Sequence, residues 1–399
     1  MSNTNMNDVF IVDAVRSPVG KIGGAFSNVR PDDLGAHALK SLMDRMQSVD
    51  PTQIEEVYFG AANGAGEDNR NVARMSVLLA GLPTSIPGAT VNRLCGSGLE
   101  AVFSASRAIA VGDIDVAVAG GVESMTRAPW IVLKPAKGFP TSHEQMWNST
   151  LGWRMTNPNM PSEWTVALGE GAEILADKYS ISRQEQDEFA AHSHAKAAAA
   201  WAAGHFAGEV AQYPGVTLEQ DECIRADSTI EKLATLKPVF RKEGSVTAGN
   251  SSPMNDGSAA MLLMSGAGVE RHSVKARARI VARATSGVEP QLYGIGPVQA
   301  AQKALTNAGL TWSDIDVVEL NEAFAAQSLA CLREWPELDT QKVNPLGGAI
   351  AIGHPLGCSG VRLLTTLTNQ LERTGGRYGL AAMCIGVGQG IALIIENNL

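Results

Sequence analysis

The feature that most constrains this chain is an internal duplication, in which three short apolar segments from its first third reappear in the same order in its last third. Each segment has the length and apolar character of a buried strand. The pairs are residues 10–14 with 279–283, 55–59 with 316–320, and 116–120 with 380–384. Helix-like segments, such as 32–46 and 297–308, lie between them. We therefore expect an α/β fold of two similar halves with buried, largely parallel strands.

A long segment in the middle of the chain interrupts this pattern. It holds five of the seven tryptophans and a strong helix signal over 182–203. Ser182 and Glu185 have the spacing of a capping box, and Gly204 is a helix stop signal. Such insertions on rigid scaffolds commonly cover an active site or bind most of a ligand.

The interruption predicts a division of the chain into two halves and an inserted loop domain. The N-terminal half comprises residues 1–121 and 245–276, the loop domain 122–244, and the C-terminal half 277–399.

Composition and charge argue against a nucleic-acid-binding, membrane-spanning or secreted protein. A net charge of −9 argues against a nucleic-acid surface, because phosphate binding needs clustered Lys and Arg. The longest apolar runs, such as 391–395, are too short to span a membrane. The first eight residues resemble no secretion signal, the C-terminal residues are no peroxisomal signal, and five scattered cysteines fit a reducing compartment. We expect a cytoplasmic protein with neither nucleic-acid nor membrane partners.

One cysteine lies in a motif that favours catalysis. Residues 91–98 read VNRLCGSG, which places Cys95 between an extended apolar run and the first turn of an expected helix. A helix N-terminus shifts a thiol towards the thiolate, and Gly96 and Gly98 let the backbone approach the sulfur closely. Cys95 is therefore a candidate nucleophile.

The second half carries three further motifs. Residues 321–327 read NEAFAAQ after an expected strand, 344–355 read NPLGGAIAIGHP, and 384–390 read CIGVGQG between two expected strands. Neither glycine-rich stretch opens a helix as Gly-x-Gly-x-x-Gly or carries the lysine of a phosphate loop, so nucleotide hydrolysis and dinucleotide binding are not expected.

Together the four motifs resemble those of the thiolase family, the acyltransferases that cleave or form 3-ketoacyl-CoA thioesters. The resemblance covers essentially the whole chain. It implies the thiolase fold, a duplicated five-layer α/β/α/β/α core with an inserted loop domain. It also implies coenzyme A as a co-substrate, no permanently bound cofactor, no metal, and a homodimer or homotetramer.

The resemblance assigns roles to the motif residues. Cys95 matches the acylated nucleophile, His354 the base that takes its proton, and Cys384 the acid and base at the substrate α-carbon. Asn321 matches the amide that orients a water beside His354 to stabilise an enolate. The backbone N–H groups of Cys95 and Gly386 match the oxyanion hole for the tetrahedral intermediate.

The resemblance also places four residues near coenzyme A. Ser252 and Ala248 match positions beside the pantetheine, Arg225 matches a position near the adenine nucleotide, and Phe324 lines the pocket.

Several segments are similar to one branch of the family, the β-ketoadipyl-CoA thiolases. These segments are CIGVGQG, where Val387 stands in place of glycine, the run AGEDNRNVAR over 65–74, and LGWR over 151–154. A dicarboxylic acyl chain needs a cation at the far end of its pocket. The candidates are Arg70, Arg74 and Arg154. We favour Arg154 because it lies in the tryptophan-rich loop.

Other interpretations remain open at this point. The substrate could instead be acetoacetyl-CoA or a fatty-acid 3-ketoacyl-CoA, and a thiolase-like scaffold could bind acyl-CoA or lipid without turnover. A condensing ketoacyl synthase shares the architecture but has His or Asn where this chain has Cys384.

The remaining cysteines and two neighbouring histidines have plainer interpretations. Cys223, Cys331 and Cys358 are expected to be small buried apolar residues. His192 and His194, two apart on a helix, point to different faces and are expected to be solvated rather than to bind zinc.

Overall fold

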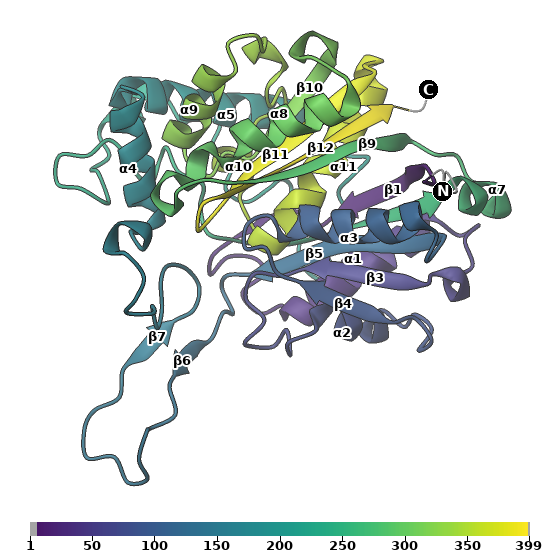
Figure 1. Cartoon of the computed structure of the whole chain (residues 1–399), viewed down its shortest axis with the longest axis horizontal. Helices are drawn as coiled ribbons and strands as arrows, with labels where there is room; N and C mark the ends of the chain where they lie inside the picture. Colours follow the sequence, from purple (N-terminus) through teal and green to yellow (C-terminus); the bar gives the residue numbers. More distant parts are fainter. Residues whose placement is uncertain (1–5, 398–399) are drawn as a thin grey trace, which may run out of the picture.

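The computed structural model describes residues 6–397. The first five and last two residues, which contribute to the expectation about targeting signals, lie outside this range. Chain order alternates strands and helices in both halves, as the duplicated pattern predicts (Figure 1).

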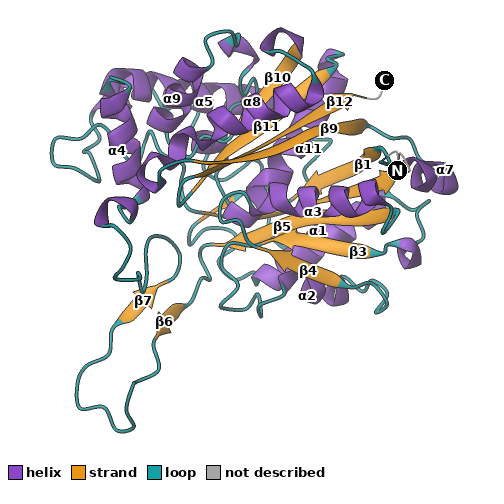
Figure 2. Ribbon diagram, in the orientation of Figure 1, coloured by secondary structure: helices purple, strands orange, loops and turns teal. Residues whose placement is uncertain are grey.

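The strands of both halves join in one sheet of ten strands, in the order β10-β11-β12-β9-β1-β8-β5-β3-β4, with β2 pairing β8 (Figure 2). The N-terminal half contributes β1 (Val9–Arg16), β2 (Gly20–Lys21), β3 (Glu56–Gly60), β4 (Gly88–Val91), β5 (Val116–Ser124) and β8 (Asn255–Ser265). The C-terminal half contributes β9 (Ala278–Gly287), β10 (Ile315–Leu320), β11 (Tyr378–Ile385) and β12 (Gln389–Asn397). All six segments of the predicted duplication are strands.

The expectation of largely parallel strands is wrong. Among the described strands, parallel pairing is limited to β3 with β4, β3 with β5, and β10 with β11. By contrast, β8 and β12 run antiparallel to both of their main neighbours. The halves themselves meet through a short antiparallel pairing of β1 with β9 at Phe10 and Ile11. Buried strands read as continuous apolar runs whichever way their neighbours run, so the sequence pattern could not distinguish the two arrangements.

Two helices form the central layer between the strands of the two halves. α3 (Ser97–Val111) and α11 (Leu356–Thr374) share one apolar cluster with strands from both halves. By length and composition α3, with the residues just before it, could span a membrane, but two-thirds (67%) of that window is buried inside the protein. Its apolar character therefore reflects its place in the core.

Further helices cover the outer faces of both halves. α1 (Pro31–Arg45) and α2 (Val72–Leu79) pack on the N-terminal half, and α8 (Gly296–Ala308) packs on the C-terminal half. Alternating helix and strand layers around α3 and α11 give the five-layer arrangement that the family resemblance implies. Outside the inserted segment, the other helices are α7 (Gly266–His272), α9 (Ala325–Glu334) and α10 (Ala349–Ile352). The 3-10 turns there are η1 (Pro51–Gln53), η3 (Pro290–Ile295), η4 (Trp312–Asp314) and η5 (Thr340–Lys342).

The inserted segment has little regular structure before its helices. It contains β6 (Trp130–Val132), β7 (Met146–Asn148), η2 (Ser162–Trp164), α4 (Leu168–Lys178), α5 (Arg183–Ala202) and α6 (Ile230–Ala234). β6 and β7 form a hairpin that projects from the body of the molecule (Figure 1). The predicted capping box is present, since the side chains of Ser182 and Glu185 each accept the other's backbone N–H.

A buried ion cluster fastens the end of the inserted segment to the core. The Arg16 guanidinium, at the end of β1, lies 2.7 Å from Glu209 and 2.8 Å from Asp221, and all three side chains are almost fully buried. Two carboxylates hold the pKa of Arg16 above its usual value despite burial. Removing one partner from such a cluster leaves an uncompensated buried charge.

Candidate active site

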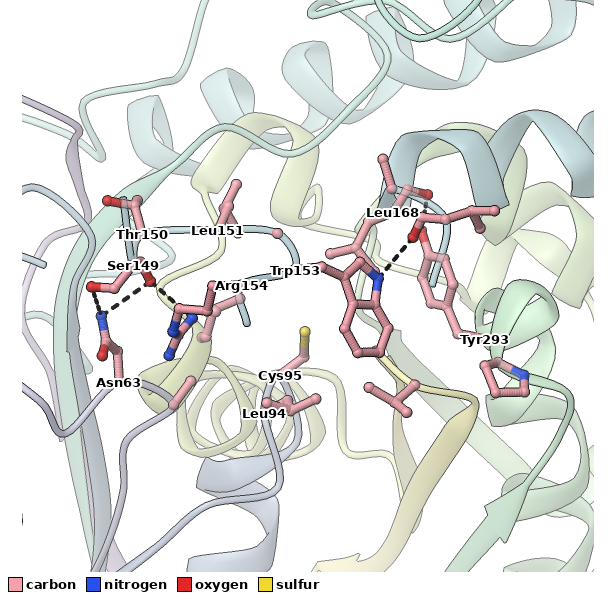
Figure 3. Close-up of a pocket in the computed structure, with 18 of the residues that line it drawn as sticks. Asn63, Leu94, Cys95, Ser149, Thr150, Leu151, Trp153, Arg154, Leu168 and Tyr293 are labelled. Atoms are coloured by element: carbon pink, nitrogen blue, oxygen red, sulfur yellow. Dashed lines mark hydrogen bonds between the residues drawn. The ribbon is translucent and has the colours of Figure 1, made fainter. Parts of the chain in front are cut away.

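A cavity of about 390 Å³ opens over Cys95 at the junction of the two halves and the inserted segment. Figure 3 shows that its two ends differ. On one side of Cys95 lie the polar residues Asn63, Ser149, Thr150 and Arg154, and on the other lie Trp153, Leu168 and Tyr293. The cavity can therefore hold a ligand with a polar and an apolar part beside a thiol.

The turn between β4 and α3 positions Cys95 as the sequence predicts. Gly96 is the N-cap of α3, and Leu94 adopts a left-handed conformation (φ 48°) that brings the thiol to the cavity floor. A Cβ on Gly96 would lie 2.5 Å from Cδ1 of Ile385, so a larger residue in this turn would force the Ile385 side chain of β11 to move.

The expected shift of Cys95 towards the thiolate is wrong in its net direction. Hydrogen bonds from the backbone N–H groups of Gly386 and of Cys95 itself lower the pKa of the thiol, but burial outweighs them and raises this pKa to about 11. The sequence shows the helix N-terminus but not the depth at which the sulfur lies. Cys95 is therefore a neutral thiol that needs a base to become a nucleophile.

His354 lies just before α11 and is almost fully buried (5% exposed). Its Nδ1 is 2.6 Å from the Ser359 hydroxyl oxygen, and that hydroxyl donates to the carbonyl of Pro355. The Ser359 oxygen therefore accepts the Nδ1 hydrogen, which leaves Nε2 with its lone pair. Burial, followed by the charge of Arg362, lowers the pKa of His354 to about 3, so the ring is neutral and can accept a proton.

Asn321 and Cys384 come from neighbouring strand ends. Asn321 follows β10, and its Nδ2 lies 3.3 Å from Nε2 of His354, while its Oδ1 is buried without a protein partner. Cys384 lies in β11 and clusters with Tyr293 and Ala323. Burial, and then the nearby Cys95, raises the pKa of Cys384 well above its usual value. The structure thus pairs Asn321 with His354 and places Cys95 near enough to Cys384 to affect the pKa of Cys384.

The hairpin between β11 and β12 places Gly386 at the cavity. A side chain joins this hairpin to the Cys95 turn: Nη1 of Arg93 donates to Oε1 of Gln389 at 3.0 Å. The two loops therefore form one assembly, although their motifs are far apart in the sequence.

Arg154 is the only charged side chain among the described residues that line this cavity. It is half-buried and makes one long contact, 3.4 Å, from Nη1 to the carbonyl of Ser149. Arg74 instead donates to the carbonyls of Ile86 and Thr84, and Arg70 does not line the cavity. Of the three predicted cations, the fold brings only Arg154 to the cavity.

The four residues expected near coenzyme A lie outside the cavity lining. Three of them adjoin: the Ser252 N–H donates to the carbonyl of Ala323 at 3.0 Å, beside Phe324, and Ala248 is exposed four residues earlier. Arg225 is exposed on a separate segment.

The expectation that His194 is solvated is wrong. It is 6% exposed, and its Nδ1 accepts the backbone N–H of Arg225 at 3.2 Å. Burial lowers the pKa of His194 to about 4, so its neutral ring holds this segment in place. The exposed neighbour His192 behaves as predicted. All five cysteines are free and buried, which confirms the expectation for Cys223, Cys331 and Cys358.

Sequence reasoning missed several residues that shape the site. Ser359 orients the His354 ring, and its only signal was its place in the first turn of the helix after the histidine. The buried Glu123 accepts the N–H groups of Ala62, Asn63 and Gly357, so it holds together loops from both halves. Burial raises the pKa of Glu123 to about 7. No local pattern marked it.

Comparisons with known proteins agree with this geometry. Residues 9–267 match the model of the thiolase N-terminal domain and 274–397 that of the thiolase C-terminal domain. The chain is 53% identical to β-ketoadipyl-CoA thiolase of Pseudomonas putida, over 98% of this chain and 100% of the relative. It is 50% identical to 3-oxoadipyl-CoA/3-oxo-5,6-dehydrosuberyl-CoA thiolase of Escherichia coli K12, with the same coverage.

Solved structures give the same result for the fold. Human mitochondrial 3-ketoacyl-CoA thiolase in complex with CoA superposes with a TM-score of 0.93 at 39% identity, covering 99% of each chain. An acetyl-CoA acetyltransferase from Bacillus anthracis superposes with a TM-score of 0.92 at 40% identity, covering 99% of this chain and 100% of the other.

Proposed function

Since this chain belongs to the thiolase family of acyltransferases, we propose that it cleaves β-ketoadipyl-CoA with coenzyme A to give succinyl-CoA and acetyl-CoA. The choice of substrate rests on the position of Arg154. It is the one charged side chain among the described residues lining the cavity over Cys95. A charge-assisted hydrogen bond to a carboxylate is the contact such a residue makes best. The two relatives named above, which are thiolases of β-ketoadipyl-CoA and 3-oxoadipyl-CoA, support the same substrate.

Cys95 is the nucleophile of the proposed reaction, and His354 is its base. Both groups are neutral at rest, because burial raises the pKa of the thiol and lowers that of the imidazole. The free lone pair on Nε2 of His354 takes the thiol proton as the sulfur attacks the keto carbon of the substrate. Ser359 supports this role because it holds the hydrogen on Nδ1.

Backbone N–H groups stabilise the oxyanion that forms in this attack. The backbone N–H groups of Gly386 and Cys95 lower the pKa of the Cys95 thiol, although burial outweighs them. A tetrahedral intermediate on Cys95 places its oxyanion within reach of the same donors. Donors fixed in place before the reaction are effective because they need no reorganisation.

The second carbon of the cleaved bond leaves as an enolate of acetyl-CoA. His354, now protonated, and Asn321 stabilise its negative charge, and Cys384 donates the proton that completes acetyl-CoA. The high pKa of Cys384 suits it to hold that proton until an enolate requires it. Cys384 then deprotonates an incoming coenzyme A, which attacks the acyl group on Cys95 and releases the shortened acyl-CoA.

Coenzyme A binds along the surface that leads to the cavity. Ser252, Ala248 and Phe324 flank the pantetheine, and Arg225 lies near the adenine nucleotide. The adjacency of the 247–252 loop to the motif that begins at Asn321 supports this arrangement, because Ser252 is hydrogen-bonded to Ala323. The CoA complex of the human thiolase supports coenzyme A as the co-substrate.

The protein acts as a homodimer or homotetramer in this proposal. The projecting β6–β7 hairpin exposes several large apolar side chains, including Trp130 (62% exposed) and Phe139 (99% exposed). Such side chains favour burial against another copy of the chain. Analytical ultracentrifugation should find no monomer at micromolar concentration, and a monomeric enzyme with full activity would contradict this assembly.

The proposed location is the cytoplasm. Five free, buried cysteines support it, because disulfides are rare in reducing compartments. Recovery of the enzyme in a periplasmic fraction would contradict this location.

The direct test compares coenzyme A-dependent cleavage of β-ketoadipyl-CoA and acetoacetyl-CoA, with Cys95→Ala as the inactive control. We expect a large preference for β-ketoadipyl-CoA in kcat/KM. Equal or faster turnover of acetoacetyl-CoA would identify a general acetyl-CoA acetyltransferase instead. Turnover of neither substrate by the folded protein would favour a non-catalytic acyl-CoA-binding protein.

A further inference from the structure

The tip of the β11–β12 hairpin has a backbone conformation that its residue does not favour. Val387 adopts a φ of +64°, in the left-handed region, between Gly386 and Gly388. A side chain branched at Cβ rarely adopts this region, whereas glycine does so without a clash. Strain of this kind persists where the side chain serves a purpose, and an observed outlier is a starting point for a functional hypothesis.

Val387 lies in the wall of the cavity over Cys95. A Cβ built on its neighbour Gly386 would be 3.6 Å from a carbon of Leu94 and from a carbon of Leu168, so this part of the hairpin adjoins the cavity wall that Leu168 helps to form. On the other side of Val387, the carbonyl of Gly388 accepts the N–H of Val288 at 2.8 Å. Val387 therefore follows a residue that adjoins the apolar end of the cavity, and 39% of it is exposed.

The hairpin cannot relieve this strain by moving away from the site. The Gln389 side chain accepts a hydrogen bond from Arg93 in the Cys95 turn, and the carbonyl of Gly388 accepts the N–H of Val288. These two contacts hold the residues that follow Val387 in the hairpin. Its isopropyl group therefore occupies a fixed place in the cavity.

We propose that Val387 is a specificity-determining residue that fills the apolar end of the cavity and excludes 3-ketoacyl chains with an alkyl tail. Arg154 and Leu168 lie on opposite sides of Cys95 (Figure 3). A chain with a terminal carboxylate escapes this exclusion in the proposal, because its tail extends towards Arg154. This inference rests on the proposed function and adds a second element to its substrate selection: Arg154 attracts the carboxylate, and Val387 rejects the alkyl competitor. Selective sites commonly combine an attractive and a repulsive element.

The test compares Val387→Gly and Val387→Ala with the wild-type enzyme on β-ketoadipyl-CoA and on 3-oxooctanoyl-CoA, a substrate with an alkyl tail. We expect Val387→Gly to lower the preference for β-ketoadipyl-CoA by about tenfold or more, mainly through faster cleavage of 3-oxooctanoyl-CoA. Val387→Ala should fall between the two enzymes, because it removes two methyl groups and keeps Cβ.

Thermal melting supplies an independent readout of the strain. Val111→Gly is the matched control, since Val111 is 66% exposed at the last position of α3, away from the cavity. Glycine in a helix is destabilising, so Val111→Gly should lower the melting temperature. Val387→Gly should melt at or above the wild-type temperature, because relief of strain offsets the added freedom of the unfolded chain.

The outcomes separate the two levels of the argument. A wild-type enzyme without preference for β-ketoadipyl-CoA would overturn the proposed function itself. A preference that survives Val387→Gly unchanged would overturn only the role of Val387. A melting temperature that falls as far in Val387→Gly as in Val111→Gly would show that the valine is not strained.

Discussion

Cys95 and His354 occupy matching positions in the two halves of the molecule. Cys95 lies just before α3, and His354 lies just before α11, the two helices of the central layer. Burial shifts the pKa of both groups towards the neutral form, to about 11 for the thiol and about 3 for the imidazole. One duplicated position thus holds a proton donor in one half and a proton acceptor in the other.

The two halves differ in what surrounds these positions. The N-terminal half is extended by the inserted segment, whose residues Ser149 and Arg154 form the polar end of the cavity. The C-terminal half adds Asn321, Cys384 and Gly386 from its strand ends. The comparison suggests that the N-terminal half holds the acyl group and the C-terminal half controls protons and charge. Each prediction below tests this division.

The largest expected effect comes from removing one residue of the matched pair. His354→Ala should lower kcat for cleavage by about 10⁴-fold, as should Cys95→Ala. The double variant should be hardly worse than either single variant, because the two groups act as one unit. Steady-state kinetics on variants with unchanged circular dichroism would measure this, and losses that multiply in the double variant would show that the residues act independently.

Cys384→Ala should separate acyl transfer from carbon–carbon cleavage. Cleavage should fall by about 10²- to 10⁴-fold because the enolate loses its proton donor. Exchange of acyl groups between Cys95 and acetyl-CoA should fall much less, because the coenzyme A thiol, with an ordinary pKa of about 8.5, can also lose its proton to water. Incorporation of labelled coenzyme A into acetyl-CoA measures this acyl exchange. Equal loss of acyl exchange and of cleavage would refute a separate role for Cys384.

Arg154→Ala tests the polar end of the cavity. We expect kcat/KM for β-ketoadipyl-CoA to fall by about 10- to 100-fold, the usual value of a hydrogen bond to a charged group. Turnover of acetoacetyl-CoA, which has no terminal carboxylate, should change little. Arg70→Ala is the matched control, because Arg70 lies in the N-terminal half outside the cavity lining. An unchanged ratio of the two substrates in Arg154→Ala would remove Arg154 from substrate recognition.

The smallest effect concerns stability in the N-terminal half rather than catalysis. Burial raises the pKa of Asp68 from 3.8 to about 6. The folded chain therefore binds this proton more tightly than the unfolded chain, and Asp68 makes the fold less stable as pH rises from about 4 to about 6. Asp68→Asn should raise the free energy of unfolding at pH 8 by about 2–3 kcal/mol and change it little at pH 4.

Urea unfolding at both pH values measures the effect of Asp68→Asn. Asp44→Asn is the control, because the side chain of Asp44 is 64% exposed. Equal effects of Asp68→Asn at both pH values would contradict the raised pKa of Asp68.

The parts of this molecule that follow from local sequence were predictable. The capping box of α5 depends on Ser182 and Glu185 alone, and the apolar strand segments mark themselves by their length. The motif around Cys95 predicted the turn before α3, because glycines and helix starts are local signals.

The parts that depend on distant partners were not predictable. Strand direction is set by which strands meet in the sheet. The pKa of Cys95 and the burial of His194 depend on what covers them. Only the fold separates Arg154 from Arg70 and Arg74, since three arginines in polar loops look alike in sequence.

The central claim is that Cys95 carries the acyl group while the other half completes the reaction. The most direct measurement is mass spectrometry of the enzyme mixed rapidly with β-ketoadipyl-CoA in the absence of free coenzyme A. We predict one succinyl group per chain on the peptide that contains Cys95, removed when coenzyme A is added. A succinyl group on Cys384, or turnover with no acylated enzyme, would contradict the account.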